Sequence, residues 1–131
     1  MNKEQPWTLI AEEDEDLCEI LVNVFAPHFA TSVVHTCNDA ELLLKEGKPT
    51  AVLMSDSLPD KSIVECVKMI RSGDEGGYIA VFGSFLSLPN KGNIIAAGAD
   101  IFLIKPFTIE ELEGVMRSAL DRMDVGRESS M

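Results

Sequence analysis

Acidic residues and one lysine directly follow short apolar runs that have the pattern of buried strands. They are Glu12 and Glu13 after the first run, Asp56 after the third, where the uncharged Ser55 precedes it, and Lys105 after the fifth. Carboxylates packed together repel one another and raise one another's pKa unless a cation neutralises them. Mg²⁺ suits oxygen ligands of this kind, and a lysine can pair with a carboxylate or with an added phosphoryl group. These residue types predict a crevice that binds a cation or a phosphoryl group, provided that the fold brings them together.

The elements that would position these residues alternate along the chain. Buried strands are predicted at residues 7–11, 31–35, 51–54, 78–82 and 101–104. Helices are predicted at residues 16–26, 39–46, 63–70, 89–98 and 108–123. The last helix is the clearest, because Thr108 and Glu111 form a capping box ahead of an apolar stripe. This alternation predicts an α/β fold: a doubly wound, five-stranded parallel sheet of flavodoxin-like strand order 2-1-3-4-5, with helices on both faces.

A sheet of this kind has its site at the carboxyl ends of the strands, beside the first and third, where the strand order reverses. The residues that follow the strands are therefore expected to meet in one crevice. Glu15 and Asp16 are expected instead to favour the start of the next helix. One domain is expected over residues 1–125, followed by a polar, frayed tail at residues 126–131.

The chain is strongly acidic, with 22 acidic residues against 11 basic ones and a formal net charge of −11. Such a surface repels phosphate backbones and anionic lipids, so direct binding of nucleic acid or membrane is not expected. The apolar runs are too short to span a membrane and the N-terminus lacks a signal-peptide pattern, so we expect a cytoplasmic location. Cys18, Cys37 and Cys66 have no metal-ligand spacing and are expected to be buried free thiols.

Over residues 7–123 the sequence resembles a response-regulator receiver domain of the chemotaxis-regulator type. The segments that carry the resemblance are residues 9–14, 52–59 and 98–107, the last with a Gly-Ala-Asp and a Lys-Pro-Phe motif. The resemblance implies a phosphorelay role in a two-component system. It also implies an acidic pair for Mg²⁺ at Glu12 and Glu13, a phosphoryl-contacting lysine at Lys105 and an aromatic switch residue at Phe102.

The chemically decisive positions depart from that family. Its phospho-acceptor aspartate lies four residues before a loop proline, and counting back from Pro59 gives Ser55, with Asp56 one residue late. Because side chains alternate along a strand, Asp56 is expected to face elsewhere. In the same way, the hydroxyl residue expected after the fourth strand falls on Gly83, with Ser84 one residue late.

Loss of the acceptor carboxylate changes the expected chemistry, since a serine hydroxyl is a weak nucleophile without a positioned base. The resemblance therefore predicts a degenerate pseudo-receiver that requires no cofactor. Any Mg²⁺ site, formed by Glu12, Glu13 and Asp56, should be weak because Ser55 brings no charge.

Three functions remain open. The first is a phosphorylation-independent protein-binding module, not an enzyme, whose contact surface is the fourth helix, fifth strand and fifth helix, Phe102 included. Phe85, Leu86 and Leu88 would extend this surface if exposed, although burial in the core is an equal alternative. The second is an active receiver that accepts a phosphoryl group from a histidine kinase on Asp56 through a strand bulge. The third is a structural receiver domain of a larger hybrid regulator.

Overall fold

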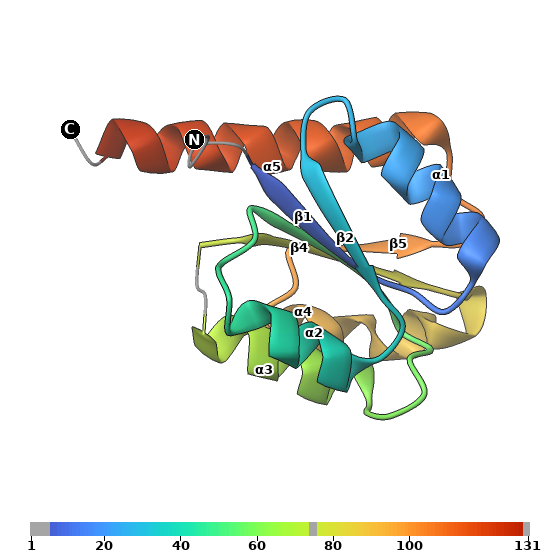
Figure 1. The fold of residues 1–131 in the computed structure, drawn as a ribbon. Helices are drawn as coiled ribbons and strands as arrows, with labels where there is room; N and C mark the ends of the chain where they lie inside the picture. The colour runs from blue at the N-terminus through green and yellow to red at the C-terminus, as the bar shows by residue number, and fades with distance from the viewer. Residues whose placement is uncertain (1–5, 74–75, 130–131) are drawn as a thin grey trace.

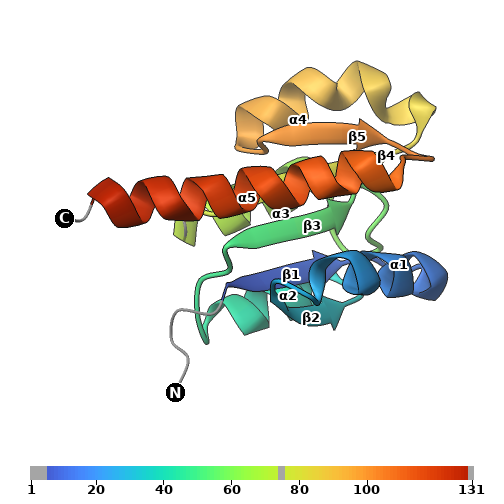
Figure 2. The ribbon, with the colours of Figure 1, turned by 90° about the horizontal axis from the view of Figure 1, so that it is seen from above.

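A computed structural model describes residues 6–73 and 76–129. Its five strands are β1 (Trp7–Ala11), β2 (Ala30–Val34), β3 (Ala51–Ser55), β4 (Tyr78–Gly83) and β5 (Ile101–Ile104). They form one parallel sheet in the order β2-β1-β3-β4-β5, which confirms the predicted fold class. β1 and β3 lie side by side in the sheet, and the strand order reverses between them (Figure 2).

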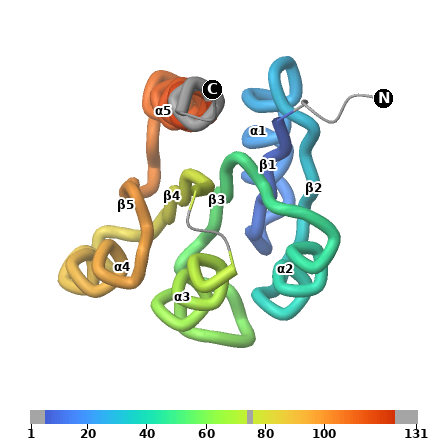
Figure 3. The backbone as a smooth tube through the Cα atoms, turned by 90° about the vertical axis from the view of Figure 1, so that its left-hand side faces the viewer, coloured from blue at the N-terminus to red at the C-terminus, as the bar shows by residue number. Residues whose placement is uncertain are grey.

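The helices form a layer on each face of the sheet. Helices α1 (Glu15–Phe25) and α5 (Ile109–Ser129) cover one face, and α2 (Cys37–Leu44), α3 (Ile63–Gly73) and α4 (Lys91–Ala97) cover the other (Figures 1 and 3). Strands β1, β3, β4 and β5 supply alternate side chains to two apolar clusters, so Leu53 packs toward α1 and α5 whereas Val52 and Met54 pack toward α2, α3 and α4. Within the described residues, no helix is both long and apolar enough to cross a membrane.

Capping side chains fix where two of the helices begin. The Asp14 carboxylate accepts hydrogen bonds from the amides of Asp16 and Leu17 at 2.9 and 3.3 Å, and so caps α1. The predicted capping box of α5 is confirmed, since Thr108 N donates to Glu111 Oε1 at 2.8 Å and Glu111 N donates to Thr108 Oγ1 at 3.0 Å. Both starts lie at the carboxyl edge of the sheet, beside the predicted site.

Two boundaries differ from the sequence-based expectation. Helix α5 continues to Ser129, beyond its predicted end at residue 123, and residues 130–131 lie outside the described part. The domain limit at residue 125 and the polar, frayed tail stay predictions. Between β4 and α4 the chain forms a 3₁₀ helix, η1 (Phe85–Asn90), so α4 begins at Lys91 and not at residue 89. On η1, Phe85 and Leu86 are 72% and 88% exposed, whereas Leu88 packs against the core.

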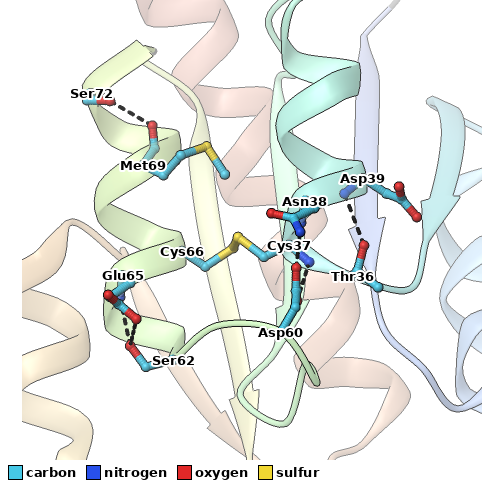
Figure 4. Close-up of a disulfide and its surroundings, with 10 residues drawn as sticks. All are labelled: Thr36, Cys37, Asn38, Asp39, Asp60, Ser62, Glu65, Cys66, Met69 and Ser72. Carbon is cyan, nitrogen blue, oxygen red and sulfur yellow. Dashed lines mark hydrogen bonds between the residues drawn. A yellow bond between two sulfur atoms is a disulfide. The ribbon is translucent and has the colours of Figure 1, made fainter.

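The cysteine prediction is correct for one residue and wrong for two. Cys18 is a buried free thiol. Cys37 and Cys66 instead form a disulfide between α2 and α3 (Figure 4). The two residues are 29 positions apart in the sequence, and only the packing of α2 beside α3 brings them together.

Candidate functional site

Strand alternation sorts the side chains at the carboxyl edge of the sheet into two groups. Ser55 follows Leu53 by two residues, and Lys105 follows Leu103 by two, so both lie on the face covered by α1 and α5. Asp56 has the opposite parity and lies on the face covered by α2, α3 and α4. The amides of Asp56 and Lys105 continue the sheet bonding, to Phe82 O and Gly83 O at 2.9 and 2.8 Å, so the alternation extends to both residues.

The first group is centred on the carboxylate of Glu12, which is 1% exposed. Its Oε1 accepts a hydrogen bond from Lys105 Nζ at 3.1 Å, and its Oε2 accepts one from the Asp14 amide at 3.0 Å. Lys105 Nζ also lies 3.4 Å from the Oγ atom of the fully buried Ser55. The Ser55 hydroxyl in turn lies 2.8 Å from Ser57 Oγ. The crevice is thus a connected network of one carboxylate, one ammonium and two hydroxyls.

The network neutralises its own charge. A carboxylate removed from water is costly unless a cation and hydrogen bonds compensate it, and Lys105 and the Asp14 amide supply both for Glu12. The Cys18 thiol, which donates to the Glu12 carbonyl at 3.3 Å, adds no charge here. Burial raises the pKa of Cys18, and the nearby Glu12 carboxylate raises it further, so the sulfur stays a neutral thiol.

The second group consists of Asp56, Gly83 and Phe102. A Cβ atom on Gly83 would lie 2.6 Å from Asp56 Oδ2 and 2.7 Å from Phe102 Cζ, closer than real Cβ atoms come. The missing side chain at residue 83 therefore makes room for the Asp56 carboxylate and the aromatic ring. Phe102 is only 6% exposed, so the expectation that it contributes to an exposed contact surface is wrong.

The structure does not bring together the three residues expected to bind Mg²⁺, Glu12, Glu13 and Asp56. Both Glu12 oxygens already accept hydrogen bonds, and Ser55 brings no charge. Asp56 lies with Gly83 and Phe102, and Glu13 is exposed, without a hydrogen bond or ion pair to any described residue. In the part of the chain that the structure describes, no three His, Cys, Asp or Glu side chains gather as metal ligands.

Other residues at this edge have roles that the sequence did not indicate. Ser84 caps η1 by accepting a hydrogen bond from the Leu86 amide at 3.2 Å. The Ser57 hydroxyl forms a hydrogen bond with the Ser55 hydroxyl, and its position two residues later on the same face could have indicated this contact. Asp60 accepts hydrogen bonds from the amides of Cys37 and Asn38 at 2.9 and 2.8 Å. These bonds, that from Cys37 above all, lower the pKa of Asp60.

The family model of the response regulator receiver domain matches residues 8–117, from β1 into α5. The chain belongs to this family. It is therefore a receiver domain of the kind found in two-component signalling, and Glu12, Ser55 and Lys105 all lie within the matched residues.

Two of the curated relatives that match this receiver domain by sequence are longer proteins. The uncharacterized transcriptional regulatory protein YkoG of Bacillus subtilis (strain 168) is 27% identical over 118 residues, which are 89% of this chain and 52% of YkoG. The transcriptional regulatory protein BasR of Escherichia coli (strain K12) is 28% identical over 124 residues, 94% of this chain and 56% of BasR. The chain thus spans about half the length of these curated relatives.

Solved receiver structures share the fold at low sequence identity. The CheY-like response regulator receiver domain protein of Methanospirillum hungatei JF-1 has a TM-score of 0.86 at 18% identity, over 94% of this chain and 99% of that one. A two-component response regulator from Clostridium difficile has a TM-score of 0.83 at 23% identity, over 91% and 98%. At such identities the likeness supports the fold and not the chemistry of the site.

Proposed function

We propose that this receiver domain is a pseudo-receiver, a signalling module that binds a protein partner without accepting a phosphoryl group and without turning over a substrate of its own. The observation that carries the proposal is which of the residues that end β3 and follow it faces Lys105. The buried hydroxyl of Ser55 lies 3.4 Å from Lys105 Nζ, and the Asp56 carboxylate lies on the other face of the sheet. Among the described residues, the one carboxylate that forms an ion pair with Lys105 is Glu12, and its other oxygen already accepts a hydrogen bond from the Asp14 amide.

The chemistry of the crevice supports the same conclusion. Attack on a phosphoryl donor requires an anionic nucleophile or a hydroxyl with a base beside it. Ser55 has Lys105, a hydrogen-bond donor, on one side and the hydroxyl of Ser57 on the other. Glu12 is the nearest base by type, but it is held in its ion pair with Lys105. Among its described neighbours, therefore, Ser55 has no base set up to take its proton.

The test is incubation with acetyl phosphate and Mg²⁺, followed by intact-mass measurement. The wild-type chain is expected to gain no phosphoryl adduct and to show only weak Mg²⁺ binding by titration calorimetry. Ser55→Asp is the matched gain-of-function variant, because it adds a carboxylate beside Lys105 and Glu12, and it should increase Mg²⁺ affinity roughly 10-fold or more. A wild-type adduct that is lost in Asp56→Ala would overturn the proposal.

That outcome would favour the second candidate, an active receiver with Asp56 as acceptor. One observation speaks for it, since Asp56 is half-buried at the end of β3 and can be approached from solvent, whereas Ser55 cannot. Its surroundings speak against it. The Asp56 carboxylate lies against Phe102 and the backbone of Gly83, and it forms no ion pair with Lys105 among the described residues.

The proposed partner surface is formed by α4, β5 and α5, and it is extended by the exposed side chains of Phe85 and Leu86 on η1. Phe85 and Leu86 are adjacent and both exposed, and a contiguous apolar patch of this kind is a candidate protein interface. A charge at Leu86, as in Leu86→Glu, should weaken a partner recovered from the source cell roughly 10-fold or more. Leu42→Glu on α2, at a residue 58% exposed and away from this surface, is the control and should leave affinity unchanged.

The cellular setting is part of the proposal. We place the domain in the cytoplasm. A net charge of −11 disfavours nucleic acid and membranes, so we expect a protein partner, with a histidine kinase among the candidates. The matched residues make up 52% of YkoG and 56% of BasR, so a structural role within a larger hybrid regulator is the third candidate. A phosphoryl adduct or a recovered partner of the isolated domain would each count against that purely structural role.

A further inference from the structure

The disulfide between Cys37 and Cys66 joins two helices beside the functional edge of the sheet. Cys37 is the first residue of α2, and Cys66 lies in the first turn of α3 (Figure 4). Both are fully buried in the apolar cluster on that face. The covalent loop that they close contains β3 and the segment after it, and therefore Ser55 and Asp56.

A second contact ties the same two segments together. Asp60, in the segment between β3 and α3, accepts hydrogen bonds from the amides of Cys37 and Asn38 at the start of α2 (Figure 4). The Thr36 hydroxyl caps α2 as well, by accepting from Asp39 N at 3.0 Å. The start of α2 is thus held by one covalent bond and by polar contacts at the surface.

Apart from the disulfide, α2 is weakly anchored. It has eight residues, of which only Cys37 and Ala40 are buried. Leu42 is 58% exposed, and Leu43 and Leu44 are only partly buried. By comparison α3 buries four residues along eleven. An element with so little buried apolar surface opens locally at low free energy, so the disulfide is the contact that limits the opening of α2.

We propose that Cys37 and Cys66 form a reversible redox site, reduced by a dithiol and reoxidised by a small disulfide, whose state sets how often α2 opens. The inference goes beyond the proposed function and does not depend on whether Asp56 accepts a phosphoryl group. Its setting draws on the proposed cytoplasmic location, where lasting disulfides are rare and those present are usually catalytic or redox-sensing. The redox chemistry itself can be tested in any setting.

The reaction is thiol–disulfide exchange. A thiolate of the dithiol attacks one sulfur of the Cys37–Cys66 bond, forming a mixed disulfide and releasing the other cysteine as a thiolate that takes up a proton. The second thiol of the reductant then attacks the mixed disulfide and releases the second cysteine. Two electrons and two protons pass to the cysteine sulfurs, and the dithiol becomes a cyclic disulfide. Because both sulfurs are buried, the first attack requires α2 to open.

The experiment uses the full chain as Cys18→Ala, so that the pair supplies its only thiols. Dithiothreitol is added without denaturant, free thiols are counted by alkylation and intact mass, and amide exchange is followed by mass spectrometry. Reduction should yield two thiols per chain and speed exchange in α2 on the order of 10-fold or more, with little change in α5. Oxidised glutathione should restore both the disulfide and the slow exchange. The variant Cys18→Ala/Cys37→Ala/Cys66→Ala should exchange fast in α2 under both conditions.

Three results would overturn the inference. The first is a disulfide that resists dithiothreitol until the whole domain is unfolded, which would make it a permanent cross-link. The second is reduction that leaves the exchange of α2 unchanged or speeds all helices equally. The third is a protein purified with both thiols free that oxidised glutathione does not convert.

Discussion

The carboxylates of Asp100 and Glu12 lie at opposite edges of the same sheet, and they differ in how they are compensated. Asp100 precedes β5 at the amino edge and accepts hydrogen bonds of 2.8–3.1 Å from Arg71, Arg122 and the amide of Ile79. Glu12, at the carboxyl edge, has one cation and one amide. The first carboxylate is saturated by two guanidinium groups, whereas the second depends on a single lysine.

At the amino edge, polar contacts connect α3, the start of β4, the segment between α4 and β5, and α5. Arg71 of α3 also donates to the carbonyls of Gly98 and Gly77, and the Arg122 guanidinium lies over the Tyr78 ring at 5.0 Å. Gly98 has a φ of 130°, and a Cβ there would lie 2.9 Å from Arg71 Cγ, so both backbone and packing favour glycine. Polar contacts at the amino edge thus join α3, β4, α5 and the segment before β5, whereas those at the carboxyl edge form the smaller network of Glu12, Lys105 and Ser55.

The largest loss of stability is expected at the amino edge. Asp100→Ala leaves two guanidinium groups and the Ile79 amide without their shared acceptor, and should lower the free energy of unfolding by about 2–4 kcal/mol. Urea denaturation measures this difference. Asp121→Ala, at an exposed residue of α5, is the control and should change stability by about 0.5 kcal/mol or less. Equal losses in the two variants would contradict the contrast between the edges.

A smaller effect is expected where Gly83 meets Asp56 and Phe102. Gly83→Ala introduces the Cβ that would lie 2.6 Å from Asp56 Oδ2 and should cost about 1–3 kcal/mol in urea denaturation. Gly92→Ala in α4 is the control, because a Cβ atom on Gly92 would have nothing within 4 Å. This variant should raise the free energy of unfolding by about 0.5–1 kcal/mol. Phe102→Leu should relieve part of the Gly83→Ala penalty, since the ring is one of the two obstacles. A penalty that does not depend on Phe102 would refute this account.

At the carboxyl edge, Lys105→Ala removes the only cation that contacts the Glu12 carboxylate in the described structure. The lysine side chain is 31% exposed and water can replace part of the pair, so we expect a loss of about 1–2 kcal/mol. In a double-mutant cycle, Glu12→Gln should recover part of this loss, because no buried charge then remains. Partner affinity should stay within roughly a few-fold of wild type. Abolished binding in a folded Lys105→Ala would make the crevice the functional centre.

The fold and the two faces of the site were predictable because they follow from strand alternation. Buried strands alternate with amphipathic helices, and this pattern leads to the observed strand order. The separation of Ser55 from Asp56 follows from the same period of two, since neighbouring residues of a strand face opposite ways. Whether this separation abolishes phosphoryl transfer stays a prediction.

Contacts that depend on tertiary packing were not predictable from the sequence. The pairing of Cys37 with Cys66 requires α2 and α3 to lie side by side, and three cysteines alone allow several pairings. The guanidinium partners of Asp100 come from α3 and α5, far away in the sequence. The Gly-Ala-Asp motif singled out Asp100 but did not indicate these partners. The exposed fractions of Phe85 and Leu86 depend on how η1 turns, which the apolar residues do not specify.

The smallest predicted effect concerns Asp60, whose pKa is lowered by the amides of Cys37 and Asn38. A carboxylate with a lowered folded-state pKa stabilises the fold above its unfolded value of about 3.9, and this contribution is lost as the pH falls through the folded-state pKa. Asp60→Asn should therefore be less stable than wild type near neutral pH, and the two should converge below about pH 4. Urea denaturation across this range measures the difference. Thr36→Ala is the matched control, because it removes another cap of α2 through a hydroxyl that does not titrate, so its deficit should not depend on pH. An Asp60→Asn deficit that persists unchanged in acid would mean that shape, and not charge, joins this residue to α2.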